Sequence, residues 1–229
     1  MSSYVLVHGA FRGGWAWERV ARLLRAAGHD AHTPSLTGMG DRAHLADRPV
    51  TLGTWARDVT AVVETYDLHD VHLVGHSQGG LVVRQTAAGL GDRVASVAYL
   101  DAPVADTGER GVDLNPGGAP DDDALPPADL LIPATPVAAG GDIDDALAAW
   151  MNERLCATPF GPSLERVTAP PPDVPTVVAF CRDTPAGYPC WVTRGRMDDR
   201  GEPYTVIDAG HDAPLSRPAT VTDWLQRVG

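Results

Sequence analysis

Short apolar runs alternate with stretches of helical periodicity in the first and last parts of the chain. The runs predict buried strands and cover residues 4–7, 71–74, 94–100, 176–181 and 204–207, with a short edge strand at 30–32. Apolar residues three or four positions apart predict amphipathic helices over 15–27, 54–68, a stretch ending near 88, and 219–228. This alternation predicts an α/β fold, with a parallel sheet and helices on both faces.

Two residues are expected to mark helix ends. Gly28 follows the helix predicted over 15–27, and a glycine just past the last apolar position is typical of a helix C-terminus. Thr54 opens the helix predicted over 54–68, and its hydroxyl suits an N-cap.

The regular pattern stops after Asp101. Residues 104–172 are rich in Pro, Gly and Asp, and only 142–155 within them predicts a helix. A loop-rich insertion of this length is usually functional or mobile. We expect an α/β core from 1–103 and 173–229, with 104–172 as a small cap over the carboxyl edge of the sheet. A disordered surface excursion is the alternative.

A serine stands where a strand is predicted to turn sharply into a helix. The motif Gly75-His76-Ser77-Gln78-Gly79 follows the apolar run 71–74 and precedes a helix-compatible stretch. Strand, turn and helix are the context of a nucleophile elbow. The flanking glycines give the strained serine backbone room where strand and helix approach closely. Ser77 is therefore the predicted nucleophile.

A serine nucleophile needs a base, and the base needs a carboxylate to orient it. His211 lies just past the last predicted strand, on the sheet edge expected to carry the elbow. Asp183 follows the strand over 176–181 and gives the chain order Ser77, Asp183, His211, which suits a catalytic triad. Asp101, at the end of the preceding strand, is the main alternative to Asp183. Less favoured carboxylates are Asp198, Asp199 and Asp208.

Attack on a carbonyl creates an oxyanion that needs preorganised N–H donors. The backbone N–H of Gln78 is one candidate because it follows the nucleophile. The glycine-rich turn over residues 8–14 can curve close to a ligand, and we expect the N–H of Ala10 to be the second donor. His8 is expected to fix this turn rather than to act as a base.

Several residues are candidates for the wall of an apolar substrate pocket, although each residue type is more often simple core. The candidates are Gly9, Phe11, Trp15, Leu131 and Trp150.

Composition narrows the possible chemistry. The net charge of −12 argues against nucleic acid or an anionic membrane as the main partner. All 18 basic residues are arginines, which excludes a Schiff-base lysine and a Walker-type phosphate loop.

The three cysteines have no metal-ligand spacing and are expected to be free thiols. No secretory signal or membrane span is evident, so we expect a cytoplasmic protein. The compositional bias suggests a bacterial source, and a homodimer is one option for its oligomeric state.

Together these motifs resemble the short α/β hydrolases, and more narrowly the plant methylesterase and hydroxynitrile lyase branch with its bacterial esterase relatives. The resemblance rests on residues 5–10, Trp15-Ala16-Trp17, residues 50–52 and the elbow, and in outline on the last fifty or so residues. It implies an α/β-hydrolase fold with a six-stranded core, a compact cap and no cofactor. The lyases carry a threonine where Gly9 stands and a lysine where Asp212 stands. Their absence makes hydroxynitrile cleavage an unfavoured expectation.

The leading functional hypothesis is a serine hydrolase that cleaves a carboxylic ester or lactone of a small, partly apolar molecule through an acyl-enzyme on Ser77. The alternative is a lyase or cyclase that acts on a natural product with the same triad and without hydrolysis. A binding module that kept the fold is a third reading, although such proteins often lack a triad member. The sequence leaves the substrate itself unidentified.

Overall fold

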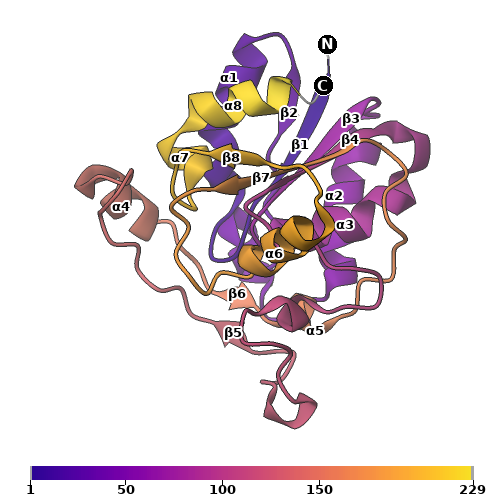
Figure 1. The fold of residues 1–229 in the computed structure, drawn as a ribbon, viewed down its shortest axis with the longest axis vertical. Helices are drawn as coiled ribbons and strands as arrows, with labels where there is room; N and C mark the ends of the chain where they lie inside the picture. Colours follow the sequence, from indigo (N-terminus) through magenta and orange to yellow (C-terminus); the bar gives the residue numbers. More distant parts are fainter. Residues whose placement is uncertain (1, 228–229) are drawn as a thin grey trace.

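A six-stranded parallel sheet forms the centre of the computed structural model, which describes residues 2–227 (Figure 1). Its order is β2-β1-β3-β4-β7-β8, and every neighbouring pair is parallel. The strands are β1 (Ser3–Val7), β2 (Asp30–His32), β3 (Val71–His76), β4 (Val94–Leu100), β7 (Thr176–Cys181) and β8 (Thr205–Ile207). The predicted α/β architecture is confirmed, and each predicted strand lies within two residues of its expected bounds.

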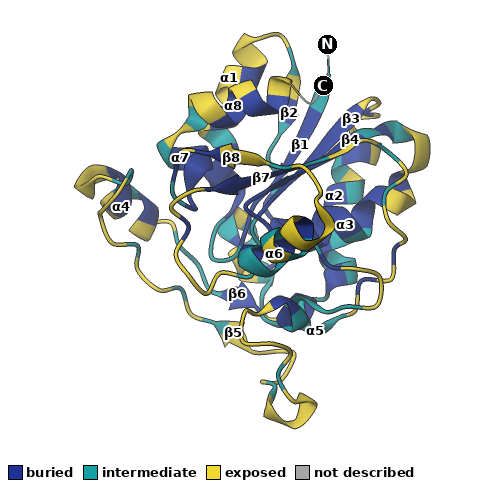
Figure 2. Cartoon of the chain, viewed as in Figure 1, coloured by how far each residue is buried: buried dark blue, intermediate teal, exposed yellow. Residues whose placement is uncertain are grey.

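Helices cover both faces of the sheet. One face packs against α1 (Glu18–Ala26), α7 (Ala213–Ser216) and α8 (Pro218–Gln226), and the other against α2 (Leu52–Thr65), α3 (Gly79–Leu90) and α6 (Cys190–Arg200). Strand β1 shows why two layers form. Tyr4 and Leu6 enter the core on the first face, and Val5 and Val7 enter the core on the second, because side chains alternate along a strand. Figure 2 shows the buried sheet between these helices.

The helix ends differ from the predictions in detail. Thr54 is not the N-cap of α2; Thr51 is, and the two threonines form a reciprocal capping box. The helix predicted over 15–27 opens with a 3-10 turn (Gly14–Trp17) before α1. Gly28 follows it with φ 87°, as expected of a C-terminal glycine. The last helix ends at Gln226, and its predicted end at residue 228 lies outside the described residues.

Among residues 2–227, helix α6 is the one long helix that the sequence pattern did not predict. Gly195 lies inside it, and Val192 and Thr193 are β-branched, so its intrinsic helix propensity is low. Its apolar side, which includes Cys190 and Met197, packs into the core beside β4 and β7. Burial against the sheet therefore determines this helix more than local preference does.

The segment 104–172 runs between β4 and β7 and has little regular structure. It holds α4 (Asp145–Asn152), shorter than the predicted 142–155, the one-turn α5 (Gly161–Leu164), and a two-stranded sheet of β5 (Leu131–Ile132) and β6 (Thr158–Pro159). Most of residues 115–131 is exposed and projects from the body of the molecule (Figures 1 and 2). The division into core and cap stays a prediction.

A buried arginine fastens both ends of this segment to the core. Arg84 on α3 is 3% exposed, and its guanidinium donates to the carbonyls of Ala169 and Pro170 and to the hydroxyl of Thr107. A buried cation needs such compensation. The two ends of the segment are thereby held beside the helix that follows Ser77.

Candidate active site

The backbone at Ser77 has the geometry of a nucleophile elbow. Ser77 lies between β3 and α3 with φ 52°, a left-handed conformation that is unusual for a residue with a side chain. Its N–H donates to the carbonyl of Leu100 at 3.1 Å, and its own carbonyl accepts from Gly80 at 2.9 Å. A strained residue held by such bonds is characteristic of a functional turn.

The glycines around the elbow are required by close packing. A Cβ at Gly75 would lie 2.6 Å from the carbonyl oxygen of Gly79, and a Cβ at Gly79 would lie 2.5 Å from that of Val7. A Cβ at Gly9 would lie 2.6 Å from the Cβ of Ser77. The turn after β1 therefore approaches the serine so closely that only glycine fits at position 9.

His211 is paired with Asp101. Its Nδ1 lies 2.6 Å from Asp101 Oδ2, and both side chains are buried, 8% and 1% exposed. Burial would raise the pKa of Asp101, but the hydrogen bond and charge of His211, with hydrogen bonds from Thr184 and the Cys181 N–H, hold it below its usual value. Asp101 is therefore a buried, ionised carboxylate at neutral pH, suited to orient an imidazole.

This geometry corrects the prediction that Asp183 orients His211. Strand-like pairing continues past the end of β7, because Arg182 N–H donates to Ile207 and Asp183 N–H to Ala209. The Asp183 side chain is left exposed at the rim of a cavity. Asp101 instead follows β4 with φ 47°, and the carboxylate bonded to the imidazole is its own. The alternative acid considered from the sequence is thus the one that the structure supports.

His76 fixes the backbone of the histidine loop, the segment 208–212 between β8 and α7 that carries His211. Burial, followed by the charge of His211, lowers its pKa to about 3, so its ring is neutral. The Nε2 of His76 lies 2.8 Å from the carbonyl oxygen of His211 and must donate, because a carbonyl only accepts. The two rings lie 4.7 Å apart. The residue before Ser77 is thereby bonded to the residue predicted to be the base.

The turn after β1 is fixed by a second buried histidine. The N–H of Leu36 donates to His8 Nε2 at 3.0 Å, so Nδ1 carries the proton and donates to the carbonyl of Gly9 at 2.8 Å. Burial lowers the pKa of His8 to about 4. This geometry agrees with a turn-fixing role for His8.

The predicted oxyanion donors lie beside the serine. Ala10, Ser77 and Gln78 line one cavity of about 190 Å³. Within residues 2–227, neither the Ala10 nor the Gln78 backbone N–H donates to a protein acceptor. Both N–H groups are consequently free to stabilise an oxyanion.

Two cavities flank the predicted catalytic residues. The cavity of about 190 Å³ beside Ser77 has a mainly apolar wall that includes Leu81, Ile132 and Phe160. Gln78 also lines it and donates from its side-chain amide to Ser163 at 2.9 Å. The other cavity, about 570 Å³, is lined by Phe11, His211 and part of the segment 104–172. The segment therefore contributes to the walls on both sides.

The predicted pocket residues are only partly brought to these cavities. Phe11 lines the cavity beside His211, and Gly9 abuts Ser77. Trp15 and Trp150 pack edge to face at 5.3 Å in a small separate cluster, and neither lines either cavity. Leu131 is 39% exposed, while its neighbour Ile132 faces the serine cavity. The pattern of apolar residues did not separate core from pocket.

Some residues of the site had no recognisable sequence signal. Tyr188 packs edge to face on His211 with ring centroids 4.4 Å apart. Thr184 donates its hydroxyl to Asp101. Asp142, from the segment 104–172, accepts from the N–H of Gly210 at 3.0 Å. All three depend on contacts between distant loops, which spacing along the chain does not reveal.

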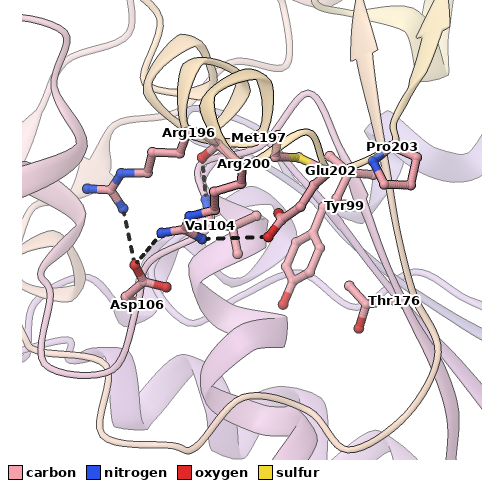
Figure 3. Close-up of a pocket in the computed structure, with 11 residues that line it drawn as sticks. Tyr99, Val104, Asp106, Thr176, Arg196, Met197, Arg200, Glu202 and Pro203 are labelled. Atoms are coloured by element: carbon pink, nitrogen blue, oxygen red, sulfur yellow. Dashed lines mark hydrogen bonds and ion pairs between the residues drawn. The ribbon is translucent and has the colours of Figure 1, made fainter.

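Figure 3 shows a further cavity, of about 310 Å³. Residues of β4, β7 and α6 line it, with Tyr99 and Arg196 among them. It contains none of Ser77, Asp101 or His211. In residues 2–227 there is no cluster of three or more His, Cys, Asp or Glu side chains placed to hold a metal ion. Nor does any described helix have the length and apolarity to cross a bilayer.

Comparison with known proteins places these observations in a family. A sequence model described as "Alpha/beta hydrolase family" matches residues 4–224. The carbendazim hydrolyzing esterase of Nocardioides sp. (strain SG-4G) is 46% identical over 120 residues, which cover 52% of this chain and 50% of that protein. The pyrethroid hydrolase of Sphingobium wenxiniae is 34% identical over 104 residues, 44% of this chain and 36% of that protein. The chain thus matches half or less of the length of these relatives.

Solved structures show the same fold over the whole chain. An extracellular α/β-hydrolase from a Paenibacillus species has a TM-score of 0.77 at 18% identity, covering 100% of this chain and 99% of that one. A methylesterase from Arabidopsis has a TM-score of 0.75 at 23% identity, covering 99% and 98%. With the family match over residues 4–224, these results show that the chain belongs to the alpha/beta hydrolase family.

Proposed function

We propose that this protein is a serine hydrolase that cleaves a carboxylic ester of a small, partly apolar molecule. The observation that carries the proposal is the buried pair of His211 Nδ1 and Asp101 Oδ2 at 2.6 Å, bonded through His76 to the elbow that presents Ser77. The names of relatives support it, since one is a carbendazim hydrolyzing esterase and another a pyrethroid hydrolase.

Each residue has a distinct role in the proposed reaction. His211 removes the proton of Ser77 as its Oγ attacks the ester carbonyl, and Asp101 stabilises the imidazolium that forms. The N–H groups of Ala10 and Gln78 hold the oxyanion. His211 then protonates the leaving alcohol, and a water that it activates releases the acid.

The free protein is poised for this step without yet making every contact. Ser77 Oγ makes no hydrogen bond to another side chain within residues 2–227. Catalytic hydrogen bonds are commonly long in free enzymes and tighten when substrate binds. The partial exposure of Ser77 beside its cavity is compatible with attack on a bound ester.

Two features weigh against hydroxynitrile cleavage. Gly9 leaves no room for a larger side chain beside Ser77. The position after His211 holds Asp212, which is paired with Arg12, so the lysine that hydroxynitrile lyases carry at this position is absent. The proposal also includes a cytoplasmic location, a bacterial source and a homodimer.

The direct test is a covalent trap of the nucleophile. Treatment with a fluorophosphonate, followed by peptide mass spectrometry, should label Ser77, and turnover of p-nitrophenyl butyrate should fall in step with labelling. Ser77→Ala should reduce kcat by roughly 10⁴-fold or more, because triad members act as a unit. Full turnover by Ser77→Ala would exclude the acyl-enzyme.

A further inference from the structure

A buried ion pair joins the turn that carries Ala10 to the loop that carries His211. Arg12 Nη2 donates to Asp212 Oδ2 at 2.8 Å and lies 2.6 Å from Oδ1. The other terminal nitrogen, Nη1, donates to the carbonyl of Ala10 at 3.0 Å. Both side chains are almost covered, 11% and 9% exposed. One guanidinium thus contacts the predicted oxyanion donor and the neighbour of the predicted base.

The pair is not arranged for maximum stability. Arg12 Nε is buried without a hydrogen-bond partner in the described part of the chain, and Asp212 Oδ1 has only the 2.6 Å ion-pair contact with Arg12. A buried ion pair gains little net stability when its desolvation is incompletely compensated. What it does fix is the relative placement of two loops that are 200 residues apart in sequence.

We propose that the pair of Arg12 and Asp212 is a positioning device for catalysis. It holds the Ala10 N–H and the His211 imidazole in one geometry, and its own two charges cancel, so that Asp101 is the carboxylate that stabilises the imidazolium. The inference rests on the proposed ester hydrolysis, because only there do the oxyanion and the imidazolium form together.

The charge of the pair matters because His211 becomes positive during the reaction. Burial would raise the pKa of Asp212, but Arg12 above all, with His211 and His76, keeps it below its usual value, so Asp212 is ionised. The other titratable groups near the charges of the pair are His8, Cys156, Cys181 and Tyr188; Asp142 and Asp183 line the same cavity, and Asp101 contacts His211. Loss of one partner leaves an uncompensated charge next to the imidazole.

The two partners can be removed separately to test this device. Arg12→Gln leaves the Asp212 carboxylate without its partner, which favours a protonated His211 imidazole. The acid limb of the pH profile of kcat/KM for p-nitrophenyl butyrate, where activity is lost as His211 is protonated, should therefore move to higher pH. Asp212→Asn leaves a guanidinium, so the limb should move to lower pH, each by roughly one unit. The kcat of each variant should fall roughly 10- to 100-fold, with KM changed much less, because small misplacements are costly.

The double variant Arg12→Gln/Asp212→Asn separates charge from geometry. Its acid limb should return to the wild-type position, while its kcat stays low. A matched control is Arg196→Gln, which breaks the bidentate pair of Arg196 with Glu109 at 2.8 Å beside the cavity of Figure 3. This control should change neither kcat nor the acid limb. Circular dichroism and thermal unfolding confirm that each variant is folded.

The measurements on these variants test the role of the pair of Arg12 and Asp212, and they do not test the proposed ester hydrolysis. Single variants with wild-type kcat, or with limbs that move in the same direction, would overturn the inference. If the single variants do not fold, Arg12→Lys retains the charge without the forked contacts, and it should lower kcat without moving the limb; unchanged kcat in Arg12→Lys overturns the proposal. The rate at which a fluorophosphonate labels Ser77 compares the same variants without an ester substrate. Failure of Ser77→Ala to abolish turnover would instead refute the proposed function.

Discussion

Asp101 combines backbone strain with full hydrogen bonding of its carboxylate. It follows β4 with φ 47°, and its carboxylate accepts from the Cys181 N–H at 3.1 Å, from Thr184 and from His211. Strain of this kind persists only where the surroundings fix it. The aspartate therefore has little freedom to leave the imidazole.

Substitution of the two candidate acids should separate them clearly. Asp101→Asn removes the charge that stabilises the imidazolium, and kcat for p-nitrophenyl butyrate should fall roughly 10³- to 10⁴-fold. Asp183→Asn is the matched control, since Asp183 is exposed, and its kcat should stay within about twofold of wild type because surface changes are usually mild. A large loss in Asp183→Asn, with none in Asp101→Asn, would reinstate the original assignment.

The sequence predicts functional residues that lie within a local motif, but it does not predict contacts between loops that are distant along the chain. Ser77 is predicted as the nucleophile because glycines, an apolar strand and a helix surround it. The choice between Asp101 and Asp183 was not decidable in this way, because both follow a buried strand and only the loop geometry differs. Tyr188 and Asp142 reach the histidine loop across the fold, so no spacing points to them.

At the level of elements, the buried strands were the most predictable part. Each is a short apolar run between helices, and strands β4 and β7 match their predicted bounds. Helix α6 was missed since its propensity is poor and tertiary burial decides it. The segment 104–172 was recognised as irregular, but its short strands β5 and β6 pair with each other through a contact that no local pattern encodes.

Two glycine substitutions should have opposite effects on stability. At Gly195 in α6, an added Cβ meets nothing within 4 Å, so Gly195→Ala should stabilise the protein by about 0.5–1 kcal/mol through lower backbone entropy in the unfolded chain. At Gly75, a Cβ would collide with the carbonyl of Gly79 at 2.6 Å, so Gly75→Ala should destabilise by about 1–3 kcal/mol. Urea unfolding measures both, and a stabilised Gly75→Ala would contradict the close packing of the elbow.

For the whole molecule, stability should depend on pH through two buried histidines. Burial lowers the pKa of His8 to about 4 and of His76 to about 3, from an ordinary value of 6.5. Both are neutral in the folded protein at pH 6, whereas the unfolded chain binds protons as the pH falls below 6.5. The free energy of unfolding should therefore fall by about 1.4 kcal/mol per pH unit for each histidine, until the folded-state pKa is reached.

The carboxylates of Asp101 and Asp212 affect the free energy of unfolding at lower pH than the histidines do. The pKa values of Asp101 and Asp212 lie below their ordinary value of 3.8, so their contribution is present above that value and is lost only as the pH falls through the folded-state pKa. Urea midpoints between pH 7 and 4.5 consequently report mainly on the histidines. His76→Asn should flatten the slope, and a midpoint independent of pH in wild type would refute the account.

The segment 104–172 forms hydrogen bonds both to the turn after β1 and to the loop that carries His211. Thr158 accepts from the N–H of Phe11 at 2.6 Å, and Cys156 N–H donates to the Phe11 carbonyl at 3.1 Å, while Asp142 accepts from Gly210, next to His211. Exchange of this segment for that of a relative would therefore alter more than the choice of substrate. A redesigned segment must keep these hydrogen bonds, because their loss would reduce substrate specificity and turnover together.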